Sequence, residues 1–270
     1  MPAYAPRFAC MELMWGDVSG SLLEPWLDEV SSIGFTGVAL RCGTVQPYLE
    51  DPERFSEMLA SRGLRLAGAY APIETSNAMV EAICGFLKRL DCQDLILHGG
   101  VRGGVPERMA LARLLDDQGF RASGQGVRLG YHHHTHVPFE TYEEIAELLR
   151  HTSPQRLHLF CDCGHATKDL IEFPAERRAY ELLIRHWERV SYIEFKDWSA
   201  DGEFGTDLGK GVADLRLVSQ LIVERAYRGW IVLEQNWPSR DSTPRDSASA
   251  GLRFARGLFD STADLSLHRR

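Results

Sequence analysis

The 270-residue sequence has no apolar run long enough to span a lipid bilayer, so no membrane-spanning segment is expected. Its six cysteines form no CxxC pair, which speaks against a zinc ribbon or a redox motif and predicts free thiols. Acidic residues outnumber basic ones by 38 to 30, so the net charge of −8 offers no overall attraction for a polyanion such as DNA. Residues 1–17 lack the basic region and apolar core of a signal peptide, and a cytoplasmic location is expected.

What the sequence does contain is one pattern repeated from end to end: a short apolar strand, a polar loop and an amphipathic helix. The predicted strands are 8–14, 37–41, 64–70, 94–98, 127–132, 157–162, 190–195 and 230–234. Helices are predicted to follow Ser21, to start near 51–53 and 106–107, and to cover 140–150, 174–189, 213–227 and 246–259. Gly34, Gly63 and Gly229 stand where helices should return to strands in a left-handed conformation.

Eight such units in about 270 residues have the size of a (β/α)8 barrel. A doubly wound open sheet would carry a GxGxxG loop after its first strand, and Trp15-Gly16-Asp17 is no such loop. We therefore predict a single-domain α/β protein, a (β/α)8 TIM barrel over residues 1–259. A polar, disordered tail is predicted for residues 260–270.

Four potential metal ligands end four consecutive predicted strands: His132, Asp162, Glu194 and Glu234. The carboxyl ends of all strands in a parallel barrel meet at one mouth, where such side chains could hold a single ion. Alternation along each strand places these residues on the same face as apolar residues that would fill the barrel, among them Phe160, Tyr192 and Val232. Mixed nitrogen and oxygen ligands suit a divalent metal, with Mn²⁺ first and Co²⁺, Mg²⁺, Zn²⁺ or Fe²⁺ as alternatives.

Each of these residues taken alone could be a helix cap or a surface partner, and only their recurrence favours a metal site. The fifth strand leaves a choice between His132 and His134, because alternation lets at most two of residues 132–134 point inward.

Several motifs in the second half carry a resemblance to a known family. They are Asp162-Cys163-Gly164-His165, Glu194-Phe195-Lys196-Asp197, Leu208-Gly209-Lys210-Gly211, the strand from Trp230 to Gln235, and Tyr131-His132-His133-His134. With them the chain resembles the xylose isomerase-like TIM barrel superfamily, which includes sugar phosphate isomerases and epimerases, ketose 3-epimerases, inosose dehydratase and a branch of AP endonucleases. The last of these motifs is similar to the YHxH of the inosose dehydratase branch. The resemblance implies that Asp162 binds metal and that His165 binds substrate hydroxyls.

One departure from the family pattern concerns the metal ligands. Family members commonly carry Glu on the fifth strand and His on the seventh, whereas this chain has His132 and Glu194 at those places. The two ligands have exchanged strands, so the resemblance implies an unchanged set of ligand types.

The resemblance and the strand-end residues together predict an isomerase or epimerase that enolises an α-hydroxy carbonyl group in a sugar or cyclitol. Glu234 is the predicted base, with Glu194 and His165 as further catalytic residues. The first alternative is an inosose-type dehydratase, because the exchange removes one of the two metal-bound carboxylates that epimerisation uses. A phosphodiesterase acting on DNA and a non-catalytic ligand-binding barrel are weaker alternatives, the former because the chain is acidic.

Further residues near strand ends are candidates for substrate binding: His98, His134, His165, Arg41, Lys196 and Trp198. Plainer roles are open for most of them. Arg41 could form a salt bridge at the barrel mouth, Lys196 could pair with Asp197, and His98 could be structural. The expected partner is a small molecule, with no nucleic acid and no membrane, in a possible homodimer or homotetramer.

Overall fold

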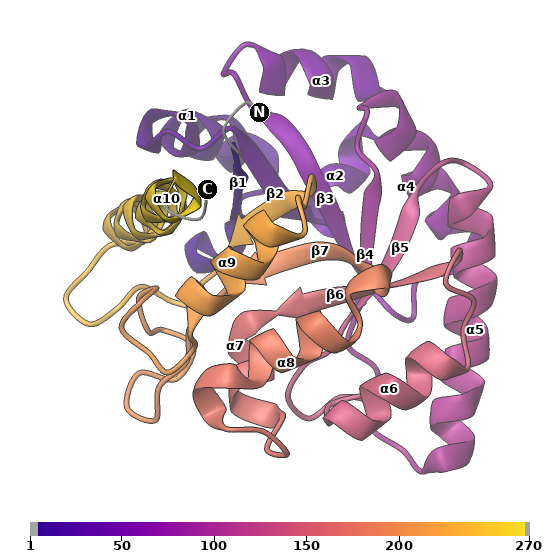
Figure 1. The fold of residues 1–270 in the computed structure, drawn as a ribbon. Coiled ribbons are helices and arrows are strands. Elements are labelled where there is room, and N and C mark those ends of the chain that lie inside the picture. The colour runs from indigo at the N-terminus through magenta and orange to yellow at the C-terminus, as the bar shows by residue number, and fades with distance from the viewer. Residues whose placement is uncertain (1–4, 268–270) are drawn as a thin grey trace.

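The computed structural model describes residues 5–267, and its eight strands form one closed barrel in sequential order (Figure 1). All neighbouring strands are parallel, and the first also pairs with the last. The strands are β1 (Arg7–Met11), β2 (Gly37–Arg41), β3 (Arg65–Pro72), β4 (Asp94–His98), β5 (Arg128–His132), β6 (Leu157–Asp162), β7 (Val190–Phe195) and β8 (Trp230–Leu233). This architecture confirms the predicted (β/α)8 barrel.

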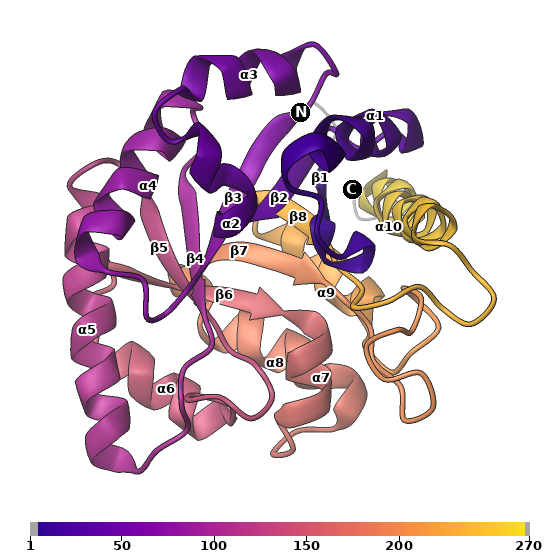
Figure 2. The ribbon, with the colours of Figure 1, turned by 180° about the vertical axis from the view of Figure 1, so that it is seen from behind.

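The helices surround the barrel on its outside, as the views from opposite sides show (Figures 1 and 2). They are α1 (Leu23–Ile33), α2 (Cys42–Val45), α3 (Pro52–Ala60), α4 (Asn77–Arg89), α5 (Val105–Ser123), α6 (Tyr142–Arg150), α7 (Cys163–Asp169), α8 (Arg178–Arg185), α9 (Leu215–Glu224) and α10 (Pro244–Leu267). In both views α10 lies beside α1, and Arg256 of α10 donates a hydrogen bond of 2.7 Å to the carbonyl of Gly34. The last helix thus closes the ring against the first.

The inside of the barrel is filled by side chains from alternate strand positions. They are Ala9, Met11, Ala39, Ala67, Tyr70, Ile96, Phe160, Tyr192, Trp230 and Val232. The rings of Phe160 and Tyr192 stack with centroids 5.2 Å apart, and Tyr70 meets Phe160 edge-on at 5.8 Å. The predicted inward face of strands six to eight is therefore confirmed, and polar side chains that end these strands sit above a packed apolar interior.

The first strand is shorter than predicted. β1 ends at Met11, and a 3-10 turn (Glu12–Trp15) replaces the last three residues of the expected strand. The buried Glu12 carboxylate accepts hydrogen bonds from the backbone N–H of Arg41 at 3.0 Å and from the Thr44 hydroxyl at 2.9 Å. These bonds tie the turn to the residues around the end of β2, so the chain leaves the sheet there.

Three helices were not predicted: the short α2, α4 and α7. Ser76 caps α4 by accepting a bond from the Met79 N–H, and Asp162 caps α7 in the same way from the His165 N–H at 2.9 Å. Because the cap of α7 is the last residue of β6, this helix starts with no loop between. The predicted helix over 174–189 is divided into α8 and two flanking 3-10 turns.

The predicted disordered tail is wrong for most of its length, since α10 continues through Leu267. No proline or glycine between Asp260 and Leu267 interrupts it. Residues 268–270 lie outside the described residues. Gly34 and Gly63 adopt the predicted left-handed conformation, with φ of 104° and 67°, whereas Gly229 does not. None of the helices in residues 5–267 combines the length and the apolar character needed to cross a membrane.

Candidate metal centre

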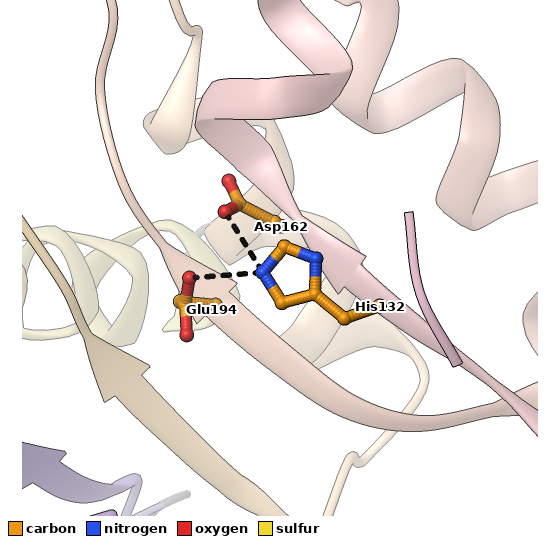
Figure 3. A group of neighbouring side chains, drawn as sticks. All are labelled: His132, Asp162 and Glu194. Carbon is orange, nitrogen blue, oxygen red and sulfur yellow. Dashed lines mark ion pairs between the residues drawn. The ribbon is translucent and has the colours of Figure 1, made fainter. Parts of the chain in front are cut away.

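Three of the four predicted ligands converge at the mouth of the barrel (Figure 3). The Nε2 atom of His132 lies 3.5 Å from Oδ2 of Asp162 and 3.9 Å from Oε1 of Glu194. One potential ligand atom from each residue lies within 4.8 Å of the other two, and all three residues are buried. This distance is compatible with three ligands around one ion.

Local contacts leave one lone-pair atom of each residue facing the others. The Nδ1 of His132 lies 2.6 Å from the carbonyl of His133, which can only accept, so Nδ1 carries the proton and Nε2 the lone pair. The Oδ1 of Asp162 is used by the cap of α7, and Oε2 of Glu194 accepts a bond of 2.9 Å from the Tyr70 hydroxyl. The remaining atoms are Nε2, Oδ2 and Oε1.

The two carboxylate oxygens among these atoms lack the hydrogen bonds that buried acceptors normally have. Oδ2 of Asp162 and Oε1 of Glu194 are buried and have no hydrogen-bond donor among residues 5–267. Buried acceptors without a partner are rare because they lose their hydration without replacement. One nitrogen and two carboxylate oxygens form a group that could hold a divalent metal ion.

The carboxylate of the fourth predicted ligand, Glu234, forms an ion pair with a lysine. The Nζ of Lys196 lies 2.5 Å from Oε1 of Glu234 and 3.6 Å from Oδ2 of Asp162. Gly164 makes room for this lysine, since a β-carbon there would lie 2.8 Å from its Cγ. The structure therefore brings three ligands together and directs Glu234 to Lys196. The alternative in which Lys196 pairs with Asp197 alone is wrong.

The charges of the site depend on each other. Burial raises the pKa of Glu194 well above its usual range, and the carboxylates of Glu234 and Asp162 raise it further. Burial opposes the charge of Lys196, but Glu234, Asp162 and Glu194 outweigh it and raise the pKa of the lysine. Burial lowers the pKa of His132 well below its usual value, which keeps the imidazole neutral, as metal ligation requires. Three carboxylates share one lysine, so ionisation of all three would leave an excess of negative charge, which a bound cation would offset.

Comparison with known proteins places this geometry in a family. The profile of the xylose isomerase-like TIM barrel matches residues 27–258. The chain belongs to the xylose isomerase-like TIM barrel family. A curated relative is inosose dehydratase from Salmonella typhimurium, which is 25% identical over an alignment of 275 residues including gaps. The alignment covers 86% of this chain and 87% of the relative.

Solved structures share the fold of this xylose isomerase-like barrel. An L-ribulose 3-epimerase superposes with a TM-score of 0.79 at 13% identity, covering 98% of this chain and 99% of its own. A xylose isomerase-like TIM barrel protein from Mycobacterium smegmatis in complex with magnesium gives a TM-score of 0.76 at 15% identity, covering 97% and 99%. At these identities the likeness concerns the fold alone.

Two further histidines of the xylose isomerase-like barrel lie beside the cluster. The Nε2 of His165 is 3.8 Å from Oδ2 of Asp162, and the ring of His134 lies 3.8 Å from that of His165, centroid to centroid. Phe204 covers His165 from the other side at 4.2 Å. Two of the three histidines predicted to contact substrate, His134 and His165, thus lie beside the predicted ligands.

The remaining substrate-binding candidates differ in the contacts that their side chains make within the protein. Arg41 forms the salt bridge that was its plainer alternative, with Nε 2.6 Å from Oε1 of Glu12. His98 is paired in register with His132 on the neighbouring strand, and burial lowers its pKa. Trp198 donates its indole N–H to Glu203 at 3.1 Å. Of these three, His98 is the one paired in register with a predicted metal ligand, His132.

Asp197 holds the rim loop that follows β7. Its carboxylate accepts bonds of 2.9 to 3.1 Å from the backbone N–H groups of Trp198, Gly209, Gly211 and Ala213. A β-carbon at Gly211 would lie 2.1 Å from Oδ1 of Asp197, so glycine is required for this approach. The loop carries Phe204 and is therefore fixed over His165.

The sequence analysis missed Tyr70, Glu12, Thr135 and Asp169. Tyr70 ended a predicted strand, so the rule that found Glu194 could have found it. Glu12 was hidden inside a predicted strand that is really a turn. Asp169 lies at the end of an unpredicted helix, and its spacing of four residues from His165 could have joined the two. Thr135 lies in a loop, and no sequence signal joined it to His165.

Proposed function

We propose that this chain is a metal-dependent enzyme that enolises an α-hydroxy carbonyl group of a sugar or cyclitol. The observation that carries the proposal is the convergence of three lone-pair atoms, on His132, Asp162 and Glu194, beside the buried pair of Lys196 and Glu234.

The metal would be held by His132, Asp162 and Glu194, with Mn²⁺ as the first candidate and Co²⁺, Mg²⁺, Zn²⁺ or Fe²⁺ to be compared. When bound there, a divalent ion would polarise a carbonyl group and its neighbouring hydroxyl and would acidify the carbon between them. Tyr70 orients Glu194 through its hydrogen bond, and the carbonyl of His133 fixes the tautomer of His132.

The chain offers two groups that could exchange protons with the substrate. Glu234 is the proposed base: Lys196 donates a hydrogen bond to its Oε1, which leaves Oε2 to accept the α proton. His165 is the second group, because its Nε2 is buried without a partner in the described structure.

Dehydration is the proposed outcome after enolisation. The alignment with a curated relative named inosose dehydratase covers 86% of the chain, and His165, with Nε2 3.8 Å from Asp162, would bind the substrate hydroxyl, while the α proton taken up by Glu234 would leave with that hydroxyl as water. Epimerisation is the second candidate, supported by the proximity of Glu194 and Glu234, whose carboxylates interact. The sequence alone favours an isomerase or epimerase over a dehydratase, and we propose the reverse order.

Proton–deuterium exchange in D₂O tests the proposal across a panel of keto-sugars and keto-cyclitols, with Mn²⁺, Co²⁺ or Mg²⁺ supplied. Deuterium incorporation at the α carbon supports enolisation. An unsaturated or dione product indicates dehydration, and an inverted carbon indicates epimerisation. Absence of exchange with every compound and metal would refute the proposed function.

Metal binding is tested separately with Glu194→Gln. Loss of a residue that only hydrogen-bonds a metal ligand weakens metal affinity by roughly 10–100-fold. Loss of the ligand Glu194 itself should weaken Mn²⁺ affinity by at least as much. Glu188→Gln is the matched control, because Glu188 is exposed beyond the opposite end of the same strand. Full Mn²⁺ occupancy and activity in Glu194→Gln would show that Glu194 is not a ligand.

A further inference from the structure

A hydrogen-bonded chain runs from His165 away from the barrel mouth. The Nδ1 of His165 lies 3.0 Å from the Thr135 hydroxyl, and this hydroxyl lies 2.7 Å from Oδ2 of Asp169. His165 is fully buried, and Thr135 is nearly so. The Nε2 atom at the other side of the imidazole ring lies 3.8 Å from Oδ2 of Asp162 and makes no hydrogen bond within the described part of the chain.

Counting hydrogens along this chain determines where each one lies. A threonine hydroxyl has one hydrogen, and a carboxylate can only accept. The contact of 2.7 Å with Asp169 therefore uses the hydrogen of Thr135, and the hydroxyl oxygen is left as an acceptor. His165 must then carry its proton on Nδ1, which leaves a lone pair on Nε2.

The opposite arrangement is less compatible with the contacts. It would turn the Thr135 hydroxyl toward Nδ1, and the backbone N–H of Thr135, 3.4 Å away, would support it. Two acceptor oxygens would then face each other at 2.7 Å unless Asp169 were protonated. Burial raises the pKa of Asp169 to about 6, so the carboxyl group is ionised in mildly alkaline solution.

We propose that Thr135 and Asp169 are positioning residues that hold His165 in its Nδ1–H tautomer, so that Nε2 meets the substrate as a hydrogen-bond acceptor. The inference deepens the proposed function and rests on it for the substrate. An acceptor at this point selects a substrate that presents a hydroxyl group to His165, and it disfavours a carbonyl or carboxylate oxygen there. The reactive carbonyl of the substrate accordingly lies elsewhere in the site.

The tautomer can be read directly, without substrate, from protein labelled with ¹⁵N-histidine. Long-range proton–nitrogen correlation spectra at about pH 8, with diamagnetic Mg²⁺ present, distinguish a protonated from an unprotonated ring nitrogen. A His165→Gln variant assigns the signals. We expect Nδ1 of His165 in the protonated range and Nε2 in the unprotonated range. The reverse pattern would overturn the inference.

Two variants of one residue test whether Thr135 sets this state. Thr135→Val removes the hydroxyl but keeps the backbone N–H, and Asp169 lies 3.6 Å from Nδ1, beyond hydrogen-bond distance. His165 should therefore shift to the Nε2–H tautomer, and kcat/KM should fall about a hundredfold. Thr135→Ser keeps the hydroxyl and should retain the Nδ1–H tautomer. An unchanged tautomer in Thr135→Val would refute the role of Thr135. Because the spectra need no turnover, a failure of α-proton exchange would count against the proposed function and not against the tautomer.

Discussion

Lys196 and Glu234 form a buried ion pair, with Nζ 2.5 Å from Oε1, that joins the residue following β7 to the residue following β8. The same ammonium group lies 3.6 Å from Asp162, so it links the predicted base to a predicted metal ligand. Lysine is the positive charge among the three carboxylates of the mouth, and its removal leaves buried charges uncompensated.

Lys196→Met should therefore lower the free energy of unfolding by about 3 kcal/mol, since breaking a buried pair leaves its partner desolvated and unpaired. Urea denaturation in the presence of EDTA measures this without help from a metal. Lys88→Met, at an exposed position of α4, is the matched control and should change stability little. Equal stability of the two variants would contradict the importance of the pair.

Tyr70→Phe should weaken Mn²⁺ affinity by roughly 10–100-fold, because the hydroxyl that orients Glu194 at 2.9 Å is lost. Calorimetric titration of the metal measures the effect. Tyr131→Phe also loses a buried hydroxyl, which binds the carbonyls of Gly99 and Pro138, and should cost stability without changing metal affinity. The same affinity in both variants would argue against an orienting role for Tyr70.

Asp197→Ala should open the rim loop after β7. Four backbone N–H groups lose their acceptor, so the amides of Gly209, Gly211 and Ala213 should exchange with solvent faster, and stability should fall by roughly 1–3 kcal/mol. Hydrogen exchange followed by mass spectrometry resolves this segment. Asp201→Ala changes an exposed carboxylate of the same loop and should leave exchange as it is.

His158 should make the protein less stable in acid. Burial, with smaller effects of Arg128 and Arg189, lowers its pKa from 6.5 to about 4. Between these values the unfolded chain binds a proton that the folded protein does not, so stability falls as the pH decreases through this range.

The slope from this one group is at most about 1.4 kcal/mol per pH unit, and less because the side chain is partly exposed. His158→Gln should flatten the plot of unfolding free energy against pH between 6.5 and about 4. His151→Gln, at an exposed position, should retain the slope. Parallel plots for the wild type and His158→Gln would contradict the prediction.

The barrel could be predicted from the sequence because its signals are local. Apolar strands, amphipathic helices and the alternation that places Phe160, Tyr192 and Val232 inside all follow from the spacing of neighbouring residues. The same parity placed His132, Asp162 and Glu194 at the mouth, since every parallel strand of a barrel ends at the same rim. Two predicted boundaries differ from the structure. β1 ends at Met11 because Glu12 forms long-range hydrogen bonds. The last helix continues past Asp260 because no proline or glycine interrupts it.

The sequence by itself thus determined the fold, the end of the barrel that carries the site and the types of residue available there. Which polar atoms remain available for a ligand depends on the tertiary structure. Glu234 pairs with Lys196, Arg41 pairs with Glu12, and Asp197 binds the backbone of a loop. His165 is linked to Asp169 through the hydroxyl of Thr135. These pairings join residues distant in the chain or held in particular rotamers, and each depends on distances of a few tenths of an ångström that no residue pattern specifies.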